Sequence, residues 1–91
     1  MPITKYHIGK SIELAKLFGA KKLVMFGSSV DDPQNANDID LAVDGIEGFK
    51  IFTFSDKLEI ILNIPVDVIP IDVKSVFLDY ILKYGRVIYE S

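Results

Sequence analysis

Acidic residues inside strand-like apolar runs are the feature that most constrains how this chain can fold. The two runs are Asp38-Ile39-Asp40-Leu41 and Val66-Asp67-Val68-Ile69. Aspartate is depleted in strands and costs free energy when it is buried without a partner. Successive side chains of a strand point to opposite faces, so Asp38 and Asp40 share one face. The other face then carries the apolar residues Ile39, Leu41 and Val43.

The third acid suggests what the first two are for. If Asp67 lies on a neighbouring strand and faces the same way as Asp38 and Asp40, the three carboxylates converge, and repulsion raises the pKa of at least one of them. A divalent cation removes that penalty, and carboxylate oxygens suit Mg²⁺ or Mn²⁺. Two such ions about 3.5–4 Å apart promote in-line displacement at phosphorus. The sequence therefore predicts a metal site made of these three aspartates.

A glycine-serine turn, Gly27-Ser28-Ser29, follows an apolar run that predicts a buried strand over 23–26. Glycine permits a tight turn, and the N–H groups after it can hold phosphate oxygens. The alternative is that Ser28 merely caps a helix after the strand. For Asp38 the alternative is a turn residue that bonds the backbone, because Asn37-Asp38 is also favourable turn chemistry.

Composition excludes several other classes of site. The chain has no cysteine and one histidine, which rules out disulfides, thiolate zinc sites and multi-histidine metal sites. Acidic residues in the loop after Ser29 miss the spacing of a calcium-binding EF-hand. The net charge of −3, with scattered basic residues, argues against strong nucleic-acid binding.

Length and hydropathy bear on organisation and partners. Ninety-one residues predict a single domain over 1–91. No signal peptide or membrane-spanning run is recognisable, which predicts a cytoplasmic protein. The apolar content of 49% and the mean hydropathy of +0.31 are high for this length, and they favour an oligomer or a partner protein.

Hydrophobic periodicity predicts an α/β (α+β) fold, with a small mixed β-sheet covered by helices mainly on one face. Helices are expected over 4–18, 49–63 and 73–84, and Gly19 and Gly85 end the first and the last. Strands are expected over 23–26, 38–43, 66–69 and 86–89, and a short helix or loop over 29–37. The second helix should carry Phe54, Leu58, Ile61 and Leu62 on one apolar face, although Phe52-Thr53-Phe54 alone could form a strand. His7 is expected to be exposed or capping, and Tyr80, Tyr84 and Tyr89 to be core or interface aromatics.

With these motifs placed, the chain resembles the minimal nucleotidyltransferase (MNT) family of the DNA polymerase beta-like nucleotidyltransferase superfamily. The resemblance rests on Gly27-Ser28, Asp38-Ile39-Asp40 and Asp67, and it covers nearly the whole chain. It implies a polymerase beta palm-like fold in which Gly27, Ser28 and Ser29 bind nucleotide phosphates. It also implies that Asp38 and Asp40 carry the metal ions, and that Asp67 completes the site and helps to activate the attacking hydroxyl.

The resemblance further implies transfer of AMP from ATP to a hydroxyl group of a partner HEPN toxin, with this chain as the antitoxin. One departure from the family pattern matters. Many relatives carry arginine shortly after Gly-Ser, whereas here the residues are Ser29-Val30-Asp31-Asp32-Pro33. That departure leaves an alternative open, in which a catalytically inactive nucleotidyltransferase-like antitoxin neutralises its partner by binding.

Overall fold

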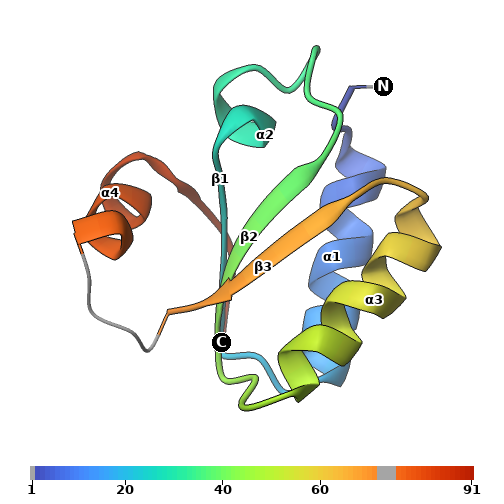
Figure 1. The fold of residues 1–91 in the computed structure, drawn as a ribbon, viewed down its shortest axis with the longest axis vertical. Helices are drawn as coiled ribbons and strands as arrows, with labels where there is room; N and C mark the ends of the chain where they lie inside the picture. The colour runs from blue at the N-terminus through green and yellow to red at the C-terminus, as the bar shows by residue number, and fades with distance from the viewer. Residues whose placement is uncertain (1, 72–75) are drawn as a thin grey trace.

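The computed structural model describes residues 2–71 and 76–91, in which helices and strands alternate (Figure 1). The helices are α1 (Lys5–Leu17), α2 (Ser28–Asp31), α3 (Lys50–Leu62) and α4 (Val76–Tyr84). The strands are β1 (Lys22–Phe26), β2 (Ile39–Asp44), β3 (Val66–Pro70) and β4 (Arg86–Glu90). Among these residues, no helix combines the length and the apolar character needed to cross a membrane.

The described strands form one mixed sheet in the order β3-β2-β1-β4. β1 pairs antiparallel with both β2 and β4, whereas β2 and β3 run parallel. Parallel neighbours need a long crossover, which α3 supplies. The Ser55 hydroxyl of α3 donates a hydrogen bond to the Val66 carbonyl at 3.0 Å, which ties the crossover helix to the start of β3. The predicted mixed α+β architecture is confirmed.

Helices α1 and α3 cover one face of the sheet, where the main core lies (Figure 1). The alternate residues of β2 are fully buried there, as their spacing predicted, and Phe54 and Leu58 of α3 pack onto them. Burial of each such side chain contributes roughly 1.5–3 kcal/mol. At the start of α1, the Thr4 N–H donates to His7 Nδ1 at 3.0 Å. The predicted capping role of His7 is confirmed, but its side chain is buried and not exposed.

Helix α4 lies over the opposite face and covers part of it through Ile81. The second, smaller cluster joins Ile81 to Val24, Phe26 and Ala42. Gly85 allows the tight return from α4 into β4, because a Cβ at this position would lie 2.8 Å from Val24 Cγ1. The rest of this face is left for the acidic side chains.

One prediction about an apolar side chain was wrong. Ile61 is 42% exposed, because the buried stripe of α3 runs through Ile51, Phe54, Leu58 and Leu62 and leaves Ile61 at its edge beside α1. Tyr80 and Tyr84 are about half exposed, so of the two expected environments the core is excluded and the interface stays a prediction. Tyr89 is partly buried against the main core. Residues 73–75 of the predicted last helix lie outside the described residues.

Candidate metal and nucleotide site

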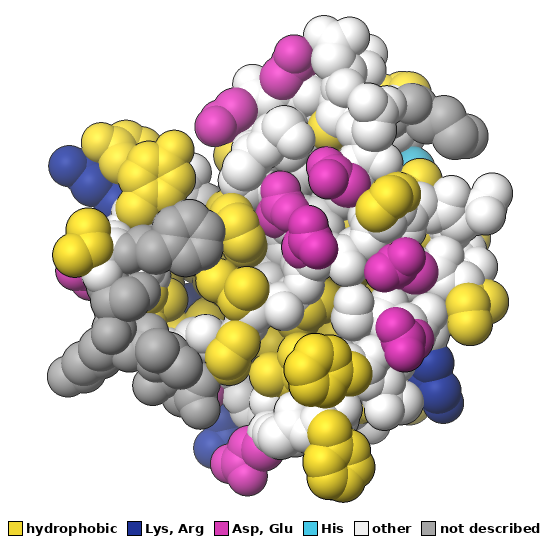
Figure 2. Space-filling model, in the orientation of Figure 1, with side chains coloured by type: hydrophobic (Ala, Val, Ile, Leu, Met, Phe, Trp, Pro, Cys, Tyr) yellow, Lys and Arg dark blue, Asp and Glu magenta, His cyan; other side chains and the backbone are white. Residues whose placement is uncertain are grey.

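Three carboxylates converge on the face of the sheet opposite α1 and α3. Asp38 immediately precedes β2, Asp40 lies within β2, and Asp67 lies within β3. The parallel register places Asp40 directly beside Asp67. One carboxylate oxygen from each of the three lies within 4.8 Å of the others. Figure 2 shows acidic side chains gathered near the middle of the visible surface. The predicted convergence of the three carboxylates, Asp38 included, is confirmed.

The electrostatics of the cluster appear most clearly at Asp40. Its pKa is raised from 3.8 to about 6, chiefly because the carboxyl is partly buried, and further because of the charges of Asp38 and Asp67 and a hydrogen bond with Asp67. The ion pairs among the described residues, Lys10–Glu13 and Lys22–Glu90, lie elsewhere. The three carboxylates are therefore not neutralised by a described lysine or arginine. The prediction of a raised pKa is confirmed, with burial as the larger cause.

The donor set fits a hard divalent cation. All three side chains offer anionic oxygens, two of them are half-buried and Asp67 is exposed, so the cluster is open to solvent and substrate on one side. Mg²⁺ binds through one or two carboxylates and keeps waters and phosphates as its remaining ligands, which such an open cluster permits. In the described part of the chain, Asp31 and Asp32 join no cluster of this kind. Asp32 instead accepts hydrogen bonds from the Asn35 amide.

Gly27 brings the α2 turn against the acidic cluster. Its φ of +68° and ψ of −152° belong to a region that is essentially restricted to glycine. A Cβ at this position would lie 2.5 Å from Asp40 Oδ2. Gly27 is also the N-cap of α2, so the reading of Ser28 as the cap is wrong. The N–H groups of Ser28 and Ser29 begin the turn and have no partner within that helix.

The two serines have different environments. Ser28 is exposed, whereas Ser29 is fully buried. The Ser29 hydroxyl donates to the Phe26 carbonyl at 2.6 Å, and the Asp40 N–H donates to the same hydroxyl at 3.4 Å. Ser29 thus connects α2 to β1 and β2, and a phosphate contact from it can come only from its backbone N–H. The sequence did not reveal this positioning role, because it depends on how two strands meet.

The sequence matches a family model described as polymerase beta, nucleotidyltransferase, over residues 3–91. Among curated proteins, no sequence matches the chain significantly.

Three of the solved structures that share this fold are of toxin–antitoxin proteins. A toxin–antitoxin structure with AMP-PNP has a TM-score of 0.78 at 23% identity, over 92% of this chain and 73% of that chain. The structure of the toxin–antitoxin MntA-HepT has a TM-score of 0.74 at 19% identity, and the match covers 97% of this chain and 74% of that chain. The structure of a tri-AMPylated Shewanella oneidensis HEPN toxin in complex with MNT antitoxin has a TM-score of 0.75 at 19% identity. That match covers 96% of this chain and 72% of that chain. These likenesses confirm the predicted fold, and the match over residues 3–91 shows that the chain belongs to the polymerase beta nucleotidyltransferase family.

Proposed function

We propose that this protein is a metal-dependent nucleotidyltransferase that transfers AMP from ATP to a hydroxyl group of a partner HEPN toxin, and so acts as an antitoxin. The observation that carries the proposal is the convergence of Asp38, Asp40 and Asp67 beside the Gly27 turn. Carboxylates without a neutralising cation are costly to hold together, and a divalent ion bound with a nucleotide offsets that cost. The general class agrees with the family of the chain.

In this proposal each acid has its own role. Asp38 and Asp40 would hold Mg²⁺ or Mn²⁺, with Asp67 completing the ligand set, and two ions would be held when the nucleotide is present. When bound, the metal stabilises charge on the phosphates and lowers the pKa of the attacking hydroxyl. Asp67 is exposed, so it can receive an acceptor hydroxyl and take up its proton. The acceptor oxygen bonds to the α-phosphorus as the bond to the bridging oxygen breaks, and pyrophosphate leaves.

The α2 turn supplies the phosphate contacts. The exposed Ser28 hydroxyl and the N–H groups of Ser28 and Ser29 lie at the start of the turn, which packs against Asp40 through Gly27. N–H groups at such a turn favour anionic oxygens. Ser29 acts as a positioning residue, because its hydroxyl is occupied by the backbone of β1 and β2.

A partner protein is supported by apolar side chains on α4 and β4. Val76, Tyr80 and Tyr84 recur at helical spacing along one side of α4, and they are 86%, 50% and 56% exposed. Val87 of β4 is also about half exposed. Structures with this fold include complexes with HEPN toxins, one of them AMPylated. We propose a HEPN protein as the partner.

A specific observation favours a second candidate, an antitoxin that binds its toxin without transferring a nucleotide. Residues 29–33, which come directly after Gly27-Ser28, include no lysine or arginine, and two of them, Asp31 and Asp32, are exposed acids. Negative charge beside the turn weakens its attraction for a triphosphate. In this candidate the acidic cluster is retained without turnover.

Transfer of label from α-labelled ATP to the purified HEPN partner, with Mg²⁺ or Mn²⁺, tests the two candidates. We expect label on the partner with the wild-type chain and none with Asp40→Asn, while Asp56→Asn on the exposed side of α3 transfers normally. Co-purification of each variant with the partner shows that the complex still forms. A stable wild-type complex without label would favour the binding antitoxin.

A further inference from the structure

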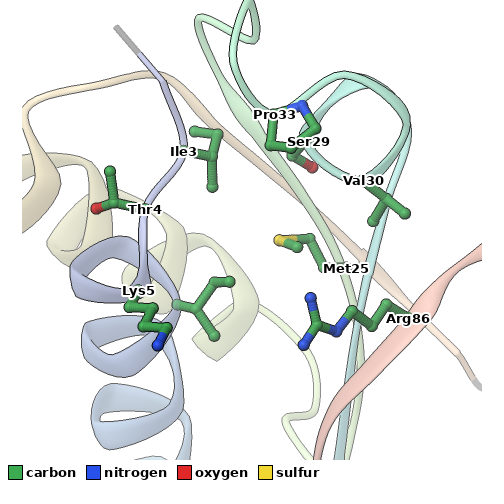
Figure 3. A pocket seen from close by; sticks show the side chains of 9 residues that line it. Ile3, Thr4, Lys5, Met25, Ser29, Val30, Pro33 and Arg86 are labelled. Carbon is green, nitrogen blue, oxygen red and sulfur yellow. The ribbon is translucent and has the colours of Figure 1, made fainter.

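A pocket of about 230 Å³ lies between α1, α2, β1 and β4 (Figure 3). Met25 lines it and points to the sheet face that α1 covers. Asp40 points to the opposite face, because it alternates with the main-core residues Ile39 and Leu41 along β2. The pocket is therefore distinct from the acidic cluster, although both adjoin the α2 turn.

The charge of the pocket is positive. Lys5 and Arg86 line it, and none of its described lining residues is acidic. Neither cation takes part in an ion pair within the described chain. Arg86 is the only arginine of the sequence, and Figure 3 shows its side chain extending from β4 toward α1. A guanidinium in this position presents a planar fork of donors that matches a carboxylate or a phosphate.

The remaining wall is largely apolar. Ile3 and Met25 are buried, Ile8 and Val30 are partly buried, and all four line the pocket. An apolar cavity of about 150 Å³ is large enough to hold benzene. The present pocket can therefore hold a body of that size together with an anionic head at the Arg86 end.

From these observations we propose that the pocket binds a small organic anion, a carboxylate or a phosphate monoester on a compact apolar body, with Arg86 as the contact for the anionic head. The buried Ser29 lines the pocket and also bonds to β1 and β2, so the pocket shares the α2 turn with the nucleotide site. The binding itself does not depend on nucleotide transfer.

Titrations followed by NMR of the isoleucine and methionine methyl groups test the proposal. Benzoate and phenyl phosphate are the anionic probes, benzamide is the neutral probe, and EDTA is present so that no metal recruits an anion to the acidic cluster. We expect saturable shifts of the Ile3, Ile8 and Met25 methyl signals with at least one anion. Whichever anion binds more tightly identifies the head group.

Loss of the charge-assisted contact should weaken binding at least about tenfold. We therefore expect the wild type to bind benzamide at least about tenfold more weakly than the anion, and Arg86→Gln to bind the anion at least about tenfold more weakly than the wild type does. Lys5→Gln should weaken binding of the anion less. Lys21→Gln should leave binding unchanged, because Lys21 is exposed and precedes β1, at the end of the strand away from the pocket. Equal affinity for benzamide, unchanged affinity in Arg86→Gln, or no saturable shift with either anion would overturn the proposal. Because neither nucleotide nor metal is present, these results are independent of the transfer assay.

Discussion

The carboxylate of Asp40 packs against the backbone of Gly27 so closely that position 27 has no room for a side chain. This contact joins the two halves of the candidate site, the acidic cluster and the α2 turn that we propose to bind phosphates. A residue from the loop after β1 and a residue of β2 are thereby held in a fixed relation before any ligand binds.

Gly27→Ala should destabilise the protein. The variant places a Cβ at φ +68° and against Asp40 Oδ2, so backbone strain and steric overlap add. We expect the free energy of unfolding in urea to fall by about 2–4 kcal/mol. Gly9→Ala is the matched control, because a Cβ at position 9 of α1 meets no atom within 4 Å and should stabilise the helix by about 0.5–1 kcal/mol.

The double variant Gly27→Ala/Asp40→Ala separates the two causes. Removal of the carboxylate relieves the overlap but not the backbone strain, so part of the lost stability should return. If Gly27→Ala were as stable as the wild type, the close packing of Gly27 on Asp40 would be wrong.

Asp40 should make stability depend on pH in the opposite sense to most aspartates. Its pKa is about 6 in the folded protein and 3.8 without its surroundings, so the folded state holds this proton more tightly. The resulting stabilisation is complete below about pH 4 and is lost as the pH rises through 6. At pH 7.5 without metal, Asp40→Asn should therefore be more stable than the wild type by about 1 kcal/mol, after allowance for solvent screening.

Urea unfolding of wild type and Asp40→Asn from pH 4 to 8 measures this difference, which should shrink toward the acid end. Asp56→Asn, an exposed substitution on α3, should show no such trend. A constant difference across the pH range would contradict the assigned pKa.

Divalent metal should stabilise the protein through the acidic cluster. A ligand that binds only the folded state at about 100 times its Kd adds roughly 2.7 kcal/mol. We expect millimolar Mg²⁺ or Mn²⁺ to raise the melting temperature of the wild type, and ATP to raise it further. Asp38→Asn and Asp67→Asn should each weaken the metal effect, and EDTA should abolish it in the wild type. Equal metal effects in wild type and both variants would place the metal elsewhere.

The two serines of the turn should respond differently to substitution by alanine. Ser29→Ala removes a buried hydroxyl that bonds to both neighbouring strands, so we expect a loss of about 1–3 kcal/mol in the free energy of unfolding. Ser28→Ala removes an exposed hydroxyl and should change stability by no more than about 0.5 kcal/mol. Ser28→Ala should instead weaken ATP binding measured by calorimetry. Reversed effects would assign the positioning role to Ser28.

Much of the fold could be predicted because local pattern and tertiary packing agree. The alternation of apolar and acidic residues in β2 set both its buried face and the direction of Asp38 and Asp40. Ile61 was misplaced because helical spacing defines a stripe but not its edges, and the position of α1 decides which edge is covered. The choice between core and interface for Tyr80 and Tyr84 could not be made from the sequence, because it depends on how α4 lies on the sheet, which it contacts through Ile81.

The acidic residues of the candidate site could be predicted from the sequence, but the residues that position its turn and line the neighbouring pocket could not. Asp38, Asp40 and Asp67 stand out because their residue type conflicts with their apolar surroundings. Ser29 carries no such signal, because a serine after a glycine suits a cap, a phosphate contact or a structural hydrogen bond equally well. Arg86 carries no signal in the sequence either. This residue lines a pocket because β4 lies beside α1, and that arrangement depends on the strand order of the sheet.

The parallel pairing of β2 and β3 also governs when the acidic centre can form during folding. Asp40 and Asp67 become neighbours only after the intervening crossover through α3 has closed, a non-local step that is slow compared with hairpin formation. A slip of one residue in that register would turn Asp67 to the opposite face. The acidic centre exists only in chains whose sheet is complete and in the correct register. An ion that binds there therefore stabilises those chains relative to partly folded species.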